Sequence, residues 1–343
     1  MPQVLIVEAL RSPVLDRRGP VSALSEDERA GRMLRGLVHR AGLDPRALEA
    51  VFLGGQTPGL GRLAVAAAGL PLSLPAHTLC AGHASGLAAL HLAATAVAAG
   101  ATGPVLAAGV SGPVLAADPG PTARWRAEWP SAEQAEARIA SWAELSGDEV
   151  ARWRDGSAGT ALAGGGGPGA GGPVGGGPVD LGEVLDLVGD FADAPPGADR
   201  VAVAGLALAD EEVVRRLRLR VRARVAAIAV AAGDPALAPM AVVPAVERAL
   251  EAAGLRASEV DLIELDGSAP AAALASLRGL DLPPARACVL GFPAASVPGL
   301  AGLPRLCRLV HALGARRARF GLCAAADGLG QAWAVVIDAQ RHH

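Results

Sequence analysis

The stretch His77-Thr-Leu-Cys-Ala-Gly-His83-Ala-Ser-Gly-Leu-Ala-Ala-Leu90 runs directly into a series of small and apolar residues that ends near Gly100. This composition predicts a helix that begins close to Ala84. The first N–H groups of a helix have no partner within it, and partial positive charge collects there. Residue 83 would lie at this positive end, where enzymes that transfer acyl groups hold a nucleophile.

Length and composition indicate a large hydrophobic core. The chain has 343 residues, 51% of them hydrophobic, and a net charge of -3, so it can form two similar halves and shows no sign of a general polyanion partner. The four cysteines have no CxxC spacing, which predicts neither a metal site nor a disulfide framework. Neither a signal peptide nor an apolar run of membrane-spanning length is present, so we expect a cytoplasmic protein without membrane contact.

Alternation of strand and helix signals indicates an α/β fold. Val4 to Glu8 has the length and apolar character of a buried strand, and Ser25-Glu-Asp-Glu28 is a capping box for a helix through about Ala41. Ala50 to Leu53 is another short strand, closed by Gly54-Gly55. Strand, helix and strand in this order are typical of α/β proteins.

The same units recur later in the chain. The helix and strand of residues 28–55 resemble those of residues 243–267, since both have an amphipathic helix, an Ala-Gly-Leu stop and a buried strand that ends in Gly. A second helix and strand, residues 84–99 and 105–109, resemble residues 297–313 and 318–325. Two copies of one unit predict two pseudo-equivalent halves, with a cleft where their helix N-termini meet.

The middle of the chain differs in composition. Residues 119–157 hold four of the five tryptophans and two charged amphipathic segments, whereas Gly164 to Gly177 is nearly all Gly, Pro and Ala and predicts a flexible loop. We therefore predict an N-terminal half of residues 1–118 plus about 197–218, a reduced loop domain of residues 119–196, and a C-terminal half of residues 219–343.

Several motifs resemble those of the thiolase family. Cys80 to Leu87 is similar to its nucleophile segment, which reads Asn, two residues, the acyl-accepting Cys, one residue and Ser-Gly-Leu. The resemblance implies a duplicated five-layer α-β-α-β-α fold with mixed sheets. Further similar segments are the opening Val7-Glu-Ala-Leu-Arg-Ser-Pro13, Gly233-Asp-Pro-Ala-Leu237, Glu264-Leu-Asp-Gly-Ser-Ala269, Gly291-Phe-Pro293 and Gly321 to Asp338.

The resemblance places different side chains at all four reacting positions. His83 stands at the nucleophilic Cys, Phe292 at the Gly-His-Pro histidine, Ala326 at the acid-base Cys, and Asp266 at the water-holding Asn. Claisen chemistry needs a thiolate to hold the acyl group and a base to remove an α-proton. Ordinary thiolase turnover is therefore expected to be absent, although the backbone N–H groups of His83 and Gly328 stand where the family forms an oxyanion hole.

Two interpretations of His83 remain open. It is either a polar remnant in a decayed site or a new base, since a helix N-terminus favours neutral imidazole. In the second case Asp266 would orient it, and Cys80, one helical turn earlier, would accept an acyl group. His77 precedes the motif and could approach the same cleft.

Binding partners are predicted with similar alternatives. Arg220, Arg222 and Arg224 would share one face of an extended segment and either contact the phosphates of coenzyme A or form a solvated strand face. No cofactor is required, and coenzyme A or acyl-CoA is the ligand that the resemblance implies. It also implies a homodimer, or a heterodimer with an active thiolase-family subunit, that pairs through Val105-Leu-Ala-Ala-Gly109. Nucleic acid is not expected as a partner.

Two functions follow from these alternatives. The first is a non-catalytic or regulatory subunit, or an acyl-CoA-binding homologue of acetyl-CoA acetyltransferases. The second is an acyltransferase or thioester-processing enzyme that uses His83 as a base with a backbone oxyanion hole.

Overall fold

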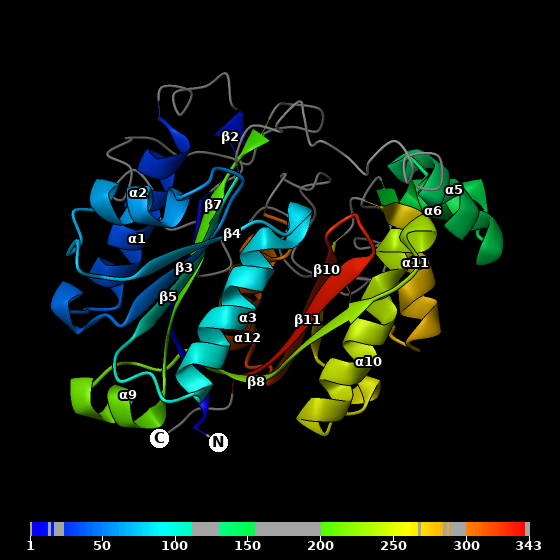
Figure 1. The fold of residues 1–343 in the computed structure, drawn as a ribbon. Coiled ribbons are helices and arrows are strands. Elements are labelled where there is room, and N and C mark those ends of the chain that lie inside the picture. Colours follow the sequence, from blue (N-terminus) through cyan, green and yellow to red (C-terminus); the bar gives the residue numbers. More distant parts are fainter. Residues whose placement is uncertain are drawn as a thin grey trace.

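The computed structural model places two copies of one strand arrangement side by side in a nine-stranded mixed sheet (Figure 1). It describes residues 2–12, 15–16, 24–111, 130–154, 200–266, 269–283, 287 and 300–339. The strands of the large sheet are β1 (Val4–Arg11), β3 (Ala50–Gly54), β4 (Ala76–Leu79), β5 (Val105–Val110), β7 (Val203–Ala209), β8 (Ala223–Ala232), β9 (Leu262–Leu265), β10 (Phe320–Ala326) and β11 (Gln331–Asp338). A separate pair consists of β2 (Leu15–Asp16) and β6 (Arg200–Val201).

The helices connect these strands. They are α1 (Glu26–Arg40), α2 (Leu60–Ala67), α3 (Ser85–Ala98), α5 (Ala132–Trp142), α6 (Gly147–Arg154), α9 (Glu211–Leu217), α10 (Val242–Ala253), α11 (Pro270–Gly279) and α12 (Leu303–Arg316). The described residues also form the 3-10 turns η2 (Pro45–Ala47), η3 (Gly82–Ala84), η4 (Pro235–Ala241) and η5 (Ala257–Glu259). The predicted capping box of α1 is present: the Glu28 N–H donates to Ser25 Oγ and the Ser25 N–H donates to Glu28 Oε2.

The sheet order confirms the duplication. The first half reads β4-β3-β5-β7-β1 and the second reads β9-β10-β11-β8 in the same sense. In both halves the inner pairs are antiparallel and the outer pairs are parallel. A parallel bridge between Ile263 and Ala287 adds the counterpart of β4 beside β9. The predicted α/β fold with two pseudo-equivalent halves is therefore confirmed.

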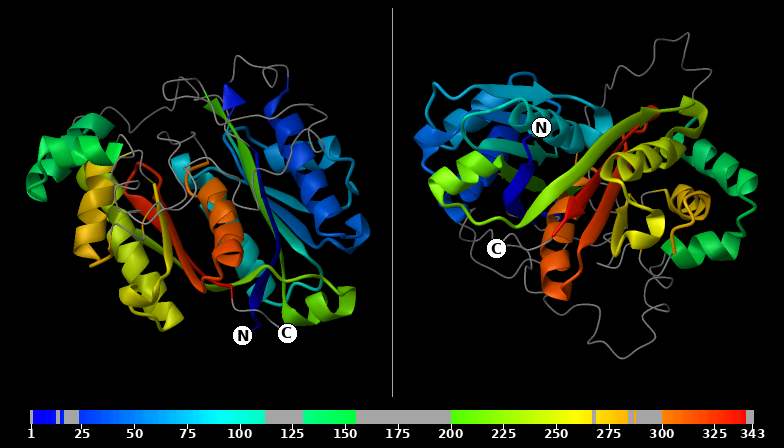
Figure 2. Two further views of the ribbon diagram at one scale, coloured as in Figure 1. Left: turned by 180° about the vertical axis from the view of Figure 1, so that it is seen from behind. Right: turned by 90° about the horizontal axis from the view of Figure 1, so that it is seen from below.

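The halves join through β1 and β8. These strands pair antiparallel over only three residue pairs, from Val4 opposite Val225 to Ile6 opposite Ala223. Just beyond this short ladder, Arg222 forms an ion pair of 2.8 Å with the buried Glu8. Because the ladder is short, the two halves of the sheet diverge on either side of it (Figures 1 and 2).

Two helices fill the space between the diverging halves. Figures 1 and 2 show α3 and α12 in the centre, with α1 and α2 outside the first half of the sheet and α10 and α11 outside the second. The central layer has its own apolar core, which includes Leu87 and Leu90 of α3 and Leu303, Leu306 and Leu309 of α12. The expected five-layer order α-β-α-β-α is thus observed.

The predicted helix of residues 297–313 is displaced in the structure. It begins at Leu303 and ends at Arg316, with Pro304 in its first turn, where the missing N–H of proline costs no hydrogen bond. The two charged segments within residues 119–157 become α5 and α6, which pack against α11. Gly164 to Gly177 lies outside the described residues, and the proposed domain bounds stay predictions.

The prediction that Val105 to Gly109 pairs across a dimer is wrong. Val105 to Gly109 belongs to β5, which lies between β3 and β7 and has partners along both edges. Its fully buried, apolar character reflects this central place in the sheet. Among the described strands of the first half, the outer edge belongs to β4.

Close backbone approach brings α3 onto the ends of the first-half strands. A Cβ on Gly54, the last residue of β3, would lie 2.4 Å from the carbonyl atoms of Ser85. A Cβ on Gly109 of β5 would lie 3.1 Å from the Cα of Gly86. Glycine at these strand ends therefore permits the start of α3 to lie against the sheet.

We predict that Gly54→Ala lowers the free energy of unfolding by about 1–3 kcal/mol, the usual cost of overpacking a tight site. The methyl group would meet the Ser85 backbone, which cannot turn away as a flexible side chain can. Urea unfolding followed by circular dichroism measures the change.

Gly279→Ala is the matched control, because a Cβ on this residue of α11 meets no atom within 4 Å. We expect it to be neutral or stabilising. Equal stability of Gly54→Ala and the wild type would contradict the close approach.

Candidate active site at the junction of the two halves

His83 lies in the 3-10 turn η3, directly before α3. The Ser85 side chain holds this turn, since its Oγ accepts the Ala81 N–H at 2.9 Å and donates to the Gly82 carbonyl at 2.8 Å. Gly82 has φ +51, in the left-handed region that glycine adopts without strain. The turn therefore depends on Gly82 and Ser85, while the His83 side chain is exposed.

Residues of the second half close around this turn. The Ala301 N–H, two residues before α12, donates to the His83 carbonyl at 2.7 Å. The His83 ring lies next to Gly328 in the hairpin between β10 and β11, because a Cβ on Gly328 would be 3.4 Å from His83 Cδ2. Gly328 has φ +87, so glycine suits both its backbone and the adjacent ring. The structure thus brings His83 and Gly328 together and places the beginnings of α3 and α12 side by side.

The two N–H groups expected to form an oxyanion hole differ in whether they already make a hydrogen bond within the protein. The His83 N–H donates to the Asp327 carbonyl at 3.4 Å, which is long for such a bond. The Gly328 N–H makes no hydrogen bond to any described residue. A ligand oxygen could therefore bind Gly328 directly, but at His83 it would replace a weak internal hydrogen bond.

Asp327 is the carboxylate beside His83, and sequence reasoning missed it. Its side chain is only 4% exposed, and its Oδ1 accepts N–H groups of Leu329 at 2.6 Å and Gln331 at 3.0 Å. Burial raises the pKa of Asp327 above its ordinary value, although these N–H groups and the nearby His83 oppose the shift. The signal in the sequence was an acidic residue directly before Gly328.

Asp266 was predicted to orient His83, but the structure pairs it differently. Its carboxylate lies 3.8 Å from Arg305 of α12, and the same guanidinium lies 3.5 Å from the buried Glu264. Asp266 follows β9, so it faces the first turns of α12 where Arg305 neutralises both acids. The acidic residue next to His83 is Asp327 instead, whose backbone carbonyl accepts the His83 N–H.

Cys80 does not lie one helical turn before His83, because the chain between β4 and η3 is not helical. Its exposed thiol donates to Gln56 Oε1 at 3.3 Å, and Gln56 Nε2 donates to the Gly82 carbonyl at 3.4 Å. Gln56, also missed, therefore links the Cys80 thiol to the turn that carries His83. His77 stacks on Phe52, with 5.0 Å between the ring centroids, rather than being held against His83.

Of the other two reacting positions, Ala326 and Phe292, the structure describes only Ala326. Ala326 ends β10 opposite Ala332 and is half-buried beside Asp327. Phe292 lies outside the described residues. The exposed Leu329 follows Gly328 and adds an apolar side chain at the rim of the site.

The three arginines predicted to share one face of an extended segment differ in their partners. Strand β8 begins only at Ala223, so Arg220 and Arg222 precede it. Arg222 pairs with Glu8, and Arg224 pairs with Asp338 at 3.1 Å. Two of the three charges are thus already neutralised, and contact of these arginines with coenzyme A stays a prediction.

Comparison with known proteins identifies the relatives of this chain. The family models for the thiolase N-terminal and C-terminal domains match residues 4–134 and 219–339. A probable acetyl-CoA acetyltransferase of Escherichia coli (strain K12) is 28% identical, in a match that spans 98% of this chain and 99% of that protein.

Other relatives match over shorter lengths or in structure alone. The 3-oxoadipyl-CoA/3-oxo-5,6-dehydrosuberyl-CoA thiolase of the same strain is 33% identical in a match that covers 39% of this chain. The match spans only 35% of that protein's own length. Human mitochondrial 3-ketoacyl-CoA thiolase, solved in complex with CoA, superposes with a TM-score of 0.79 over 99% of this chain and 98% of its own. Its sequence identity is 19%, so this likeness concerns the fold.

The raised pKa of Asp327 predicts a pH dependence. At pH values between the pKa of Asp327 in the unfolded state and its higher pKa in the folded state, the folded protein binds more protons than the unfolded chain. The stability of the wild type therefore falls as pH rises through this interval. Asp327→Asn keeps an oxygen for the Leu329 and Gln331 N–H groups but cannot ionise. We expect its stability relative to wild type to increase from about pH 4, near the unfolded pKa, towards neutral pH, as measured by urea unfolding.

Asp234→Asn is the control, because the exposed Asp234 also accepts a backbone N–H, that of Ala236, through Oδ1. It should not reproduce the pH-dependent gain. A stability difference between Asp327→Asn and wild type that stays constant from pH 4 to 8 would refute the buried carboxylate's role.

Proposed function

Because the chain belongs to the thiolase family, we propose that it binds an acyl thioester of coenzyme A without the Claisen turnover of ordinary thiolases. The observation that carries this proposal is the set of groups at the junction of the halves: the His83 imidazole, the Ala326 methyl group, and the Gly328 N–H, which has no partner among the described residues. The backbone needed to bind a carbonyl oxygen remains, while the side chains at the nucleophile and acid-base positions differ from a thiolate pair.

The chemistry of these groups supports binding over turnover. Claisen condensation needs a sulfur that holds the acyl group and a second group that exchanges protons with the α-carbon. Ala326 cannot exchange a proton. The Gly328 N–H depends on no side chain and can still polarise a thioester carbonyl. The names of the related proteins all refer to CoA thioesters, which makes this the first ligand class to test.

A role as a regulatory or non-catalytic subunit follows from this proposal. A chain that binds the thioester but does not turn it over can act on a pathway by sequestering its ligand or by association with an active subunit. Its cytoplasmic location stays a prediction from the sequence. Among the described helices, none has the length and apolar character needed to cross a membrane.

A second candidate function rests on the groups around His83. Asp327 lies next to His83, and the exposed Cys80 thiol lies on the segment that leads into the same turn. These groups would support an acyltransferase in which His83 is a base and Cys80 accepts the acyl group. The thioester carbon would then bond to Cys80 sulfur as coenzyme A leaves with the proton.

The decisive experiment incubates the full-length protein with acetyl-CoA and acetoacetyl-CoA, with and without free coenzyme A. We expect no thioester loss above buffer and no acyl adduct by mass spectrometry, while an active acetyl-CoA acetyltransferase consumes its substrate in parallel. Thioester loss or an adduct that disappears in His83→Ala or Cys80→Ser would establish the second candidate and refute the first.

Binding is measured separately by calorimetry with acetoacetyl-CoA. Gly328→Ala should weaken binding about two- to ten-fold. Its φ of +87 disfavours a side chain, so the backbone would shift and misplace the N–H, and a hydrogen bond to a neutral carbonyl is worth roughly 0.5–1.5 kcal/mol. Gly42→Ala is the matched control, since Gly42 has φ +64 but open space around it. Equal binding by both variants would contradict a site at Gly328.

We propose further that the chain forms a dimer through the edge of β4. The Val51 N–H and the Gly55 N–H donate to the carbonyls of Pro75 and Leu79, so by strand alternation Ala76 and Thr78 direct their backbone groups outwards. Two exposed leucines lie on elements near β4: Leu63 on α2, which packs against this strand, and Leu72 four residues before it. An open strand edge with apolar neighbours is suited to pairing with a second strand.

Light scattering coupled to gel filtration should give twice the chain mass for the wild type. Ala76→Pro removes an outward N–H at the first residue of the strand, where proline is tolerated, and should shift the protein to a monomer. If the wild type is a monomer alone and forms a dimer only when an active thiolase-family subunit is added, the interface belongs to a heterodimer rather than a homodimer. A dimer unaffected by Ala76→Pro would contradict the β4 interface.

A further inference from the structure

A second concave site lies at the opposite end of the central helix from His83. Its volume is about 690 Å³, and its walls come from the segment before β8, the last turns of α12 and the beginning and end of the β10–β11 hairpin. Helix α12 begins beside His83 and has 14 residues, so it separates the two sites by about 21 Å at ~1.5 Å per residue. A volume of this size lies within the range of small-molecule sites.

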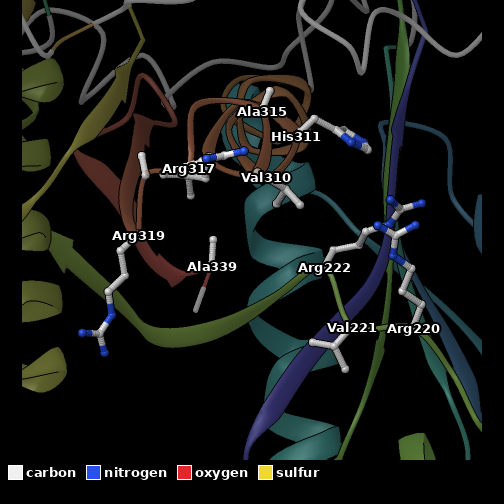
Figure 3. A pocket seen from close by; sticks show the side chains of 12 residues that line it. Arg220, Val221, Arg222, Val310, His311, Ala315, Arg317, Arg319 and Ala339 are labelled. Atoms are coloured by element: carbon white, nitrogen blue, oxygen red, sulfur yellow. The ribbon is translucent and has the colours of Figure 1, made fainter. Parts of the chain in front are cut away.

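Positive charge dominates the lining of this cavity. Arg220, Arg222, Arg317 and Arg319 line it together with His311, and its lining residues include no Asp or Glu. Figure 3 shows Arg220 and Arg222 side by side on one wall. His311 extends from α12 towards them, Arg317 lies on the other side of α12, and Arg319 extends away. The arginines belong to two chain segments that the fold brings together.

Their charges are only partly neutralised. Arg222 pairs with Glu8, and Arg319 pairs with Asp338 at 3.2 Å. Arg220 and Arg317 have no carboxylate partner among the described residues. Two unneutralised guanidinium groups facing one cavity repel each other unless an anion lies between them.

Arg222 adds an unsatisfied donor to this set. Its Nε atom is buried and has no hydrogen-bond partner among the described residues, although one terminal nitrogen contacts Glu8. A buried donor without a partner costs free energy that a ligand acceptor can recover. The geometry of guanidinium groups suits phosphate oxygens, which they bind in pairs.

The remaining wall is apolar. Val221, Val310 and Leu313 line the cavity beside the arginines, and Ala315 and Ala318 leave room near the end of α12. Such a surface covers a flat, weakly polar ring, whereas inorganic phosphate would leave it in contact with water. The combination of charge, volume and apolar wall favours a ligand with both a phosphate chain and a ring.

We propose that this cavity binds a nucleoside diphosphate, with its phosphates on Arg220, Arg222 and Arg317 and its ring on the apolar wall. The site is independent of the thioester site at Gly328. A free nucleotide and the nucleotide end of a coenzyme A molecule share this chemistry, and competition experiments distinguish them.

The test is calorimetric titration of the full-length protein with ADP, pyrophosphate and adenosine in low-salt buffer. We expect saturable ADP binding that the double variant Arg220→Gln with Arg317→Gln weakens at least ten-fold. Both residues are exposed, so the fold should persist, and thermal unfolding checks this. Binding of adenosine or of pyrophosphate as tight as that of ADP would overturn the proposal, because one half of the ligand would then contribute nothing.

The control is the double variant Arg218→Gln with Arg316→Gln. It removes the same charge from neighbouring positions outside the cavity lining, and Arg218 shares the left-handed backbone of Arg317, with φ of 53 and 54. ADP binding should change less than two-fold. An equal loss in both double variants would show general electrostatic attraction and refute a defined site.

Gly328→Ala separates this proposal from the thioester site. ADP binding should be unchanged by it, and acetoacetyl-CoA binding should be unchanged by the Arg220→Gln, Arg317→Gln variant. If Gly328→Ala abolished ADP binding, the nucleotide would belong to the thioester site, and the separate cavity would be refuted. Coenzyme A that displaces ADP in Gly328→Ala would identify its nucleotide end as an occupant of the cavity, supporting the assigned chemistry.

Discussion

Close contact between the beginning of α3 and the ends of β3 and β5 is the constraint on which the rest of the structure depends. Gly54 at the end of β3 and Gly109, one residue before the end of β5, have no side chains that would meet Ser85 and Gly86. The helix can therefore start directly over the sheet, and the turn that carries His83 projects towards the second half. A larger residue at either strand end would displace the helix, the turn and the contact with Ala301 together.

Duplication creates the place for a site but does not make its two sides alike. The first half contributes the His83 turn and the second contributes the β10–β11 hairpin with Asp327 and Gly328. Charged pairs then fix the junction: Arg222 with Glu8 where the strands cross, and Arg305 with Glu264 beneath the site. A cationic partner lets a buried carboxylate stay ionised, whereas burial alone favours its neutral form.

The thiols show how burial separates structural from reactive side chains. Burial raises the pKa of Cys307 to about 12 and that of Cys323 well above its ordinary value, so both remain protonated at neutral pH. Of the described cysteines, Cys80 alone is exposed. Any thiol chemistry of the described chain therefore centres on Cys80, whose partner Gln56 also contacts the His83 turn.

The sequence alone determined the α/β class, the duplication and the position of His83 at a helix start. These depend on local patterns: the Ser25 capping box, the repeated helix and strand units, and the small residues after Ala84. Only the tertiary structure decided that β5 is internal and β4 lies at the edge. It also replaced Asp266 with Asp327 as the neighbour of His83, and gathered Arg220 and Arg317 around one cavity. Such contacts join residues far apart in the chain, and their distances depend on how strands and helices pack, which no local pattern specifies.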